Sequence, residues 1–171
     1  MSNRASGRSH LVPPVMEIRR ATSDDAAAVA RIWYPGWCDA HLGNVPQRLV
    51  DARPEETFEP RAREHVGHTT VATVNGEVAG FVMVIGDEVE QVYVSAGHRG
   101  SGVAQALLAA AERVVAANGH SQAWLAVVAG NARARRFYER QGWTDEGLFD
   151  HRAPHPDGPI PVPAHRYAKP V

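Results

Sequence analysis

The most constraining stretch of the chain runs from Gln91 to Ala104 and reads QVYVSAGHRGSGVA. The residues up to Val94 alternate as in a β-strand, and a long apolar-striped helix pattern begins near Val103. The glycine-rich turn between them enters a helix whose first-turn N–H groups have no partner within the helix. The helix dipole adds partial positive charge there, and glycines let an anion approach the backbone. The sequence therefore predicts a phosphate or pyrophosphate site at this turn.

The spacing of this loop excludes two common nucleotide-binding motifs. No Lys follows the glycines, as a G-x-x-x-x-G-K-[ST] loop requires, and Gly102 is not followed by the third glycine of G-x-G-x-x-G. The spacing that fits is Arg99-x-x-Gly102-x-Ala104. It resembles the [QR]-x-x-G-x-[GA] pyrophosphate loop of the GCN5-related N-acetyltransferases, which bind acetyl-CoA.

A second block, from Asn131 to Trp143, strengthens the resemblance. It reads NARARRFYERQGW and is similar to the family's N-x-x-A-x-x-F-Y-x-x-x-G-F, with Trp143 in place of the last Phe. The two blocks have the family's order and spacing, and the resemblance covers roughly Ile18 to Tyr167. It implies an acetyl-CoA-dependent N-acetyltransferase of α+β fold. In that fold helices flank a mixed central sheet, and two parallel strands splay apart around the pantetheine arm of the cofactor.

Periodicity and turn residues predict the order β–α–α–β–β–β–α–β–α–β–β. Strands are expected at 17–21, 69–74, 78–85, 89–94, 121–128, 143–149 and 162–169. The first helix is expected from residue 22 until Pro35-Gly36 breaks it, and the helical pattern resumes over 37–42. Further helices are expected at 46–52, 55–66, 103–118 and 132–141. The last strand is expected at a sheet edge because it contains Pro163. The segment 150–161 contains four prolines and is predicted to be a loop.

The resemblance assigns catalytic roles to two residues. Tyr138 stands where the family places the acid that protonates the leaving thiolate, and a phenol of ordinary pKa, about 10, keeps its proton at neutral pH. Glu90 is the candidate base, because an alkyl amine of pKa about 10.4 must lose a proton before it attacks. Period two places Glu90 on one face with Val92 and Val94, and Glu88 shares that face as the alternative base. The structural alternatives are a core aromatic ring and a solvated strand-end acid.

The resemblance also implies cofactor contacts. Backbone groups of Val92, Tyr93 and Val94 would bind the pantetheine amides, and one N–H there would stabilise an oxyanion. Asn131 would bind the pantetheine arm or cap the second helix. The residues expected to hold the pyrophosphate are Arg99, Gly100, Ser101, Gly102, Val103 and Ala104.

An aromatic cluster near the N-terminus has two interpretations. Trp33, Trp37 and His41 either belong to the core or line the acceptor pocket, which in the resembled family is shaped by this part of the chain. His65 and His68 have no third ligand at a known spacing, so no metal site is predicted. The prolines around His151 and His155 favour a surface position for both.

Composition narrows the class of protein. The 171 residues are 44% hydrophobic and 22% charged, which is typical of one globular domain, expected at 16–171 after a disordered lead-in at 1–15. The net charge of −1 gives no sign of nucleic-acid or membrane-surface binding. Cys38 is the only cysteine, so no intrachain disulfide can form. We expect a cytoplasmic enzyme, and a homodimer is compatible with the sequence.

The acceptor is left open between two classes. A primary amine of a small molecule, attacked directly by acetyl transfer, is the first hypothesis, and a protein N-terminus or lysine is the second. A CoA-binding sensor without turnover is a third reading, against which the presence of both Glu90 and Tyr138 argues. A nucleotide-binding protein is disfavoured by the failed motifs.

Overall fold

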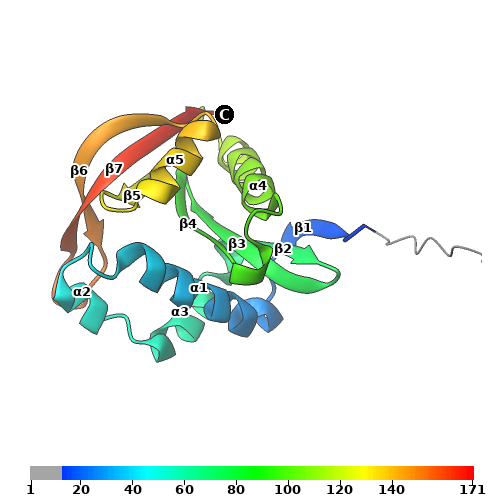
Figure 1. Cartoon of the computed structure of the whole chain (residues 1–171), viewed down its shortest axis with the longest axis horizontal. Coiled ribbons are helices and arrows are strands. Elements are labelled where there is room, and N and C mark those ends of the chain that lie inside the picture. Colours follow the sequence, from blue (N-terminus) through cyan, green and yellow to red (C-terminus); the bar gives the residue numbers. More distant parts are fainter. Residues whose placement is uncertain (1–12) are drawn as a thin grey trace, which may run out of the picture.

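The computed structural model describes residues 13–171 and places seven strands in one mixed sheet, in the order β1-β2-β3-β4-β5-β7-β6, with helices on both faces (Figure 1). The strands are β1 (Met16–Arg20), β2 (Thr69–Val74), β3 (Glu77–Ile85), β4 (Glu88–Val94), β5 (Gln122–Val128), β6 (Thr144–Ala153) and β7 (Ile160–Pro170). The α-helices are α1 (Ala26–His41), α2 (Gln47–Asp51), α3 (Phe58–Glu64), α4 (Val103–Ala117) and α5 (Ala132–Arg140). The predicted α+β fold is confirmed.

Two hydrophobic clusters lie on opposite faces of the sheet. Side chains alternate along β3, so that Phe81 and Met83 join the cluster under α1 and α3, while Val82 and Val84 join the cluster under α4. The face of the sheet on which a side chain lies therefore decides whether it packs under α1 and α3 or under α4.

β4 and β5 are parallel neighbours that separate after a single contact. Glu88 pairs with Trp124, and no further ladder pair joins the two strands. β3 occupies the other edge of β4 as far as Val94, so the edge of β4 that faces β5 is left without a partner strand. The predicted splayed parallel pair is therefore confirmed, and it opens a gap in the middle of the sheet.

β4 contains a bulge that the sequence analysis did not foresee. Met83 of β3 pairs with Gln91 and Val84 pairs with Val89, so Glu90 is an extra residue without a partner. Val92 packs against the α4 cluster together with Val89, although an unbroken period of two would place them on opposite faces. The period of two on which the predicted face of Glu90 rested is therefore interrupted at Glu90 itself.

The first long helix continues through the predicted break. Pro35 lies inside α1, which runs to His41. Gly36 packs directly against the ring of Tyr93, and a Cβ at position 36 would lie only 2.4 Å from Tyr93 Cδ1. The Pro-Gly pair therefore marks a close approach of α1 to β4, at the cost of the helix hydrogen bond that proline cannot donate.

The C-terminal strands are longer than predicted. Both strands extend into the expected loop at 150–161, leaving only residues 154–159 between them, and β7 lies between β5 and β6 instead of at an edge. Pro163 is tolerated because its carbonyl, which accepts from Ala129 N, faces the side where β5 has just ended. The proline nitrogen faces the same side, so no hydrogen bond to a neighbouring strand is lost because it has no N–H.

Residues 1–12 lie outside the described part of the chain, and so does most of the predicted lead-in. Within residues 13–171, no helix is both long and apolar enough to cross a membrane.

Candidate active site

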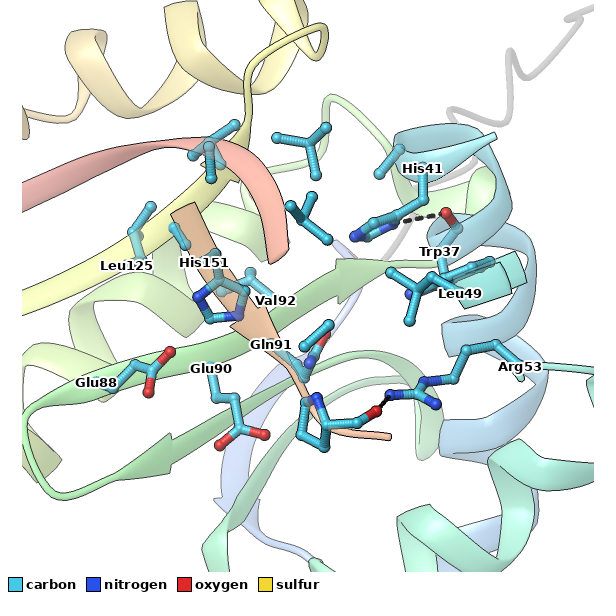
Figure 2. Close-up of a pocket in the computed structure, with 18 of the residues that line it drawn as sticks. Trp37, His41, Leu49, Arg53, Glu88, Glu90, Gln91, Val92, Leu125 and His151 are labelled. Carbon is cyan, nitrogen blue, oxygen red and sulfur yellow. Dashed lines mark hydrogen bonds between the residues drawn. The ribbon is translucent and has the colours of Figure 1, made fainter. Parts of the chain in front are cut away.

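A cleft of about 710 Å³ occupies the gap between β4 and β5. Residues from both sides of the sheet line this cleft (Figure 2). They come from the layer of α1 and α3 on one side and from α5 on the other. From the first layer come Trp37, His41, Leu49, Arg53, Arg61 and His65; from the strands and α5 come Glu88, Glu90, Val92, Tyr93, Leu125, Asn131, Tyr138 and His151. Of the predicted pantetheine contacts, Val94 lies outside this wall.

The predicted pyrophosphate loop lies beyond the end of β4, and its residues are not part of the cleft wall. Gly100 and Gly102 have φ of +76° and +86°, which favour glycine, and a Cβ at either would meet no atom within 4 Å. No side chain of the described residues caps the first turn of α4, which follows Gly102. The loop thus presents free N–H donors toward open space. The Arg99 guanidinium is paired instead with Asp39 of α1, at 3.1 Å.

Asn131 and Tyr138 bring α5 to the cleft. Asn131 Oδ1 accepts a hydrogen bond from Ala134 N at 3.2 Å, so the capping role is observed, while the same side chain also lines the cleft. Burial raises the pKa of Tyr138 to about 12, which keeps its phenol protonated. Phe137 and Tyr138 both pack on the α4 cluster, with their ring centroids 5.4 Å apart, so Tyr138 belongs to the edge of the core as well as to the cleft wall.

A pair of carboxylates lines the cleft on β4. Figure 2 shows Glu88 and Glu90 on neighbouring parts of the strand, with His151 of β6 beside them. Burial, reinforced by the negative charges of Glu90 and Asp87, raises the pKa of Glu88 to about 7. A carboxylate with such a pKa is suited to take and give protons near neutral pH.

The aromatic cluster divides between core and cleft. The Trp33 side chain is 1% exposed and lies in the core, outside the cleft wall, so the alternative in which it touches the acceptor is not supported by its position. Trp37 and His41 line the cleft as stacked rings with centroids 4.6 Å apart, and His41 Nδ1 lies 2.8 Å from the Trp37 carbonyl oxygen. Burial lowers the pKa of His41 to about 4, so the ring is neutral.

Three polar residues of the cleft were missed or misplaced by the sequence analysis. Arg61 was not among the predicted site residues, yet it lines the cleft with its guanidinium stacked over the Trp33 ring, 4.4 Å from the centroid. Arg53 follows α2 and donates to the Pro154 carbonyl across the cleft mouth. His151 was expected at the surface, but it lies on β6 in the cleft wall, and burial lowers its pKa.

One signal could have found Arg61. It lies three residues after the large apolar Phe58, which is buried, and positions three apart share a helix face. No cluster of three or more metal-ligating side chains occurs in residues 13–171.

Comparison with known proteins decides the family. The model of the acetyltransferase (GNAT) family matches residues 31–143. The chain belongs to the acetyltransferase (GNAT) family. An uncharacterized N-acetyltransferase of Mycobacterium bovis is 28% identical over 134 residues, which cover 73% of this chain and 85% of the relative.

Solved GNAT proteins share the fold. The PaiA N-acetyltransferase of Thermoplasma acidophilum, crystallised with coenzyme A, matches 92% of this chain and 99% of its own with a TM-score of 0.70 at 15% identity. A putative acetyltransferase of Salmonella typhimurium, solved with its cofactor acetyl-CoA, matches 91% of this chain and 94% of its own with a TM-score of 0.64 at 20% identity. As a GNAT protein, the chain is an acetyl-CoA-dependent acyltransferase.

Proposed function

We propose that this GNAT protein transfers the acetyl group of acetyl-CoA to a primary amine of a small molecule by direct attack. The observation that carries the proposal is the cleft, which places a carboxylate pair on β4 and the protonated phenol of Tyr138 along one wall. Its volume of about 710 Å³ lies in the range of small-molecule sites.

The residues present fit the cofactor in two places. The uncapped first turn of α4 and the open glycine loop before it offer N–H donors for the pyrophosphate. The free edge of β4 offers backbone groups of Val92 and Val94 to the pantetheine amides, because the groups of Tyr93 between them face β3. Asn131 lines the same cleft, and its amide nitrogen remains available beside the capping oxygen. The bound cofactor supplies an acetyl thioester, whose carbonyl carbon is open to attack by an amine.

Glu90 is proposed to take the proton that the acceptor ammonium must lose, with Glu88 as the alternative. The nitrogen then forms a bond to the carbonyl carbon as the carbon–sulfur bond breaks. A backbone N–H of β4 would stabilise the charge on the oxygen. Tyr138 donates its phenol proton to the departing sulfur and recovers one from the new amide nitrogen, so one proton in total is released to solvent through the carboxylate.

The test is a screen of amines for acceptor-dependent release of free CoA thiol, with hydrolysis measured in the absence of acceptor. We expect release with at least one small-molecule amine and acetylation of its nitrogen by mass spectrometry. Transfer to peptide N-termini or lysines alone would replace the small-molecule acceptor with the peptide class. Tight CoA binding without transfer to any amine would indicate a sensor instead of an enzyme.

A further inference from the structure

Two arginines of the cleft wall, Arg53 after α2 and Arg61 on α3, have no acidic partner among residues 13–171. The ion pairs of residues 13–171, with N–O distances up to 4.0 Å, involve other cations and not Arg53 or Arg61. Within the described part of the chain, Arg53 donates to two carbonyl oxygens, those of Ala52 and Pro154, and to no carboxylate. Arginines of a cleft are usually neutralised by carboxylates when no ligand does so, and these two are not.

Arg61 is the more informative of the two. Its guanidinium lies over the rings of Trp33 and Phe58, at 4.4 Å and 5.2 Å from their centroids. Its Nη1 atom is buried and has no hydrogen-bond partner among the described residues. Burial of this charge lowers the pKa of Arg61 to about 10. A buried donor without an acceptor is destabilising, so a ligand that accepts from it would relieve that cost.

The opposite charge lies in the same cleft. Glu88 and Glu90 are carboxylates of β4 without a salt-bridge partner among residues 13–171, and the charge of Glu90 is close enough to raise the pKa of Arg61 against the effect of its burial. The cleft thus has a cationic part formed by α3 and the end of α2, and an anionic part on β4. The same cleft wall includes the apolar surfaces of Trp37 and Leu49, and the neutral ring of His41.

We propose that the acceptor is an amino acid or a close relative, whose carboxylate is bound by Arg61 and Arg53 while its ammonium group faces the carboxylates of β4. The fork of a guanidinium matches a carboxylate with two parallel hydrogen bonds. The ammonium group has the charge that Glu88 and Glu90 attract, and it delivers the nitrogen to the proposed base. This inference rests on the proposed function for its chemistry, but the binding of the acid can be measured separately.

The experiment compares matched acceptors on matched variants. Amino acids, their carboxamides, the corresponding decarboxylated amines and an aminoalkyl phosphate are tested for acetylation by the parent protein. Arg61→Met removes the guanidinium and keeps an unbranched apolar stem, and Arg61→Lys keeps the charge without the fork. Arg63→Met is the control, because Arg63 lies on the same helix but pairs with Glu59 at the surface, outside the cleft.

We expect amino acids to be the best acceptors. Arg61→Met should lower kcat/KM for the acid about ten- to hundredfold, as expected for a charge-assisted hydrogen bond, and change it less than about threefold for the carboxamide. Arg61→Lys should lie between the two, and Arg63→Met should resemble the parent. The ratio of acid to carboxamide is the deciding readout, because a purely structural role of Arg61 would lower both rates equally.

A second readout is independent of turnover. Calorimetric titration of the amino acid into the protein saturated with CoA should show binding that Arg61→Met weakens by the same factor. Equal use of acids and carboxamides, a preference for the phosphate, or an unchanged ratio in Arg61→Met would overturn the inference and leave the acetyltransferase proposal intact. Acid binding through Arg61 without acetylation of any amine would overturn the proposed function and support the acid site.

Discussion

The contact between Gly36 and Tyr93 gives a prediction whose size follows from the structure. A Cβ at position 36 would lie 2.4 Å from Tyr93 Cδ1, 3.1 Å from Cε1 and 3.2 Å from Cγ. These are distances at which either the ring or α1 has to move. Gly36→Ala therefore overpacks the interface between α1 and β4, at the point where Tyr93 enters the cleft wall.

Two effects of Gly36→Ala oppose each other. Overpacking of a packed interior costs about 1–3 kcal/mol. Replacing a glycine inside a helix by alanine contributes about 1 kcal/mol of stability. The net expectation is a loss of about 1 kcal/mol in the free energy of unfolding. In a Tyr93→Val background, where most of the ring is absent, the same substitution should instead stabilise by about 1 kcal/mol.

Urea unfolding of the parent, both single variants and the double variant measures this cycle. The coupling energy should be about 2 kcal/mol, and it isolates the steric term because helix propensity contributes equally in both backgrounds. A coupling below about 0.5 kcal/mol, with alanine stabilising both backgrounds, would show that the close approach of α1 to β4 is not needed for packing.

The remaining predictions concern the cofactor and the proton transfers. Gly102→Glu should abolish CoA binding in calorimetry, because φ of +86° disfavours a side chain and the carboxylate would face the pyrophosphate; full affinity in a folded variant would refute the loop assignment. Tyr138→Phe should keep CoA affinity and lower the initial rate about a hundredfold or more, as loss of a general acid does, and an unchanged rate would remove Tyr138 from the mechanism. Glu90→Gln should lower turnover most at low pH, where little free amine exists, so a pH–rate profile that overlays the parent at every pH would contradict its role. Glu88→Gln is the comparison: since the pKa of Glu88 is raised to about 7, its capacity as a base is lost as the pH falls below 7, and a larger effect there would transfer the role to Glu88.

The parts of the site that could be predicted are formed by residues that lie close together in the sequence. The strand, glycine turn and helix around Gly102 follow each other within a dozen residues, and the resemblance of the second block placed Asn131 and Tyr138 on one helix. Hydrophobic periodicity was sufficient for most element bounds, because the two faces of β3 and the stripe of α4 are buried along their length.

The parts that were not predictable depend on pairing between distant segments. Nothing near Glu90 marks the bulge, which exists only relative to its neighbour β3. His151 enters the cleft because β6 pairs with β7 through a stretch whose prolines are typical of a loop. The positions of Arg53 and Arg61 depend on how α2 and α3 pack over the sheet, which is a contact between distant segments.

The free edge of β4 has a consequence for how such a chain diverges. If peptide groups of β4 bind the pantetheine arm, the side chains of Val92 and Val94 remain free to pack against the α4 cluster. Packing is then the main constraint on which residues can stand at these two positions. Cofactor recognition then imposes almost no demand on residue identity along the strand, and it survives any substitution that preserves the strand itself. The acceptor wall, built from side chains on other elements, is free to change separately. Two proteins whose sequences are only 15% and 20% identical to this one share its fold, and they were solved with coenzyme A and with acetyl-CoA.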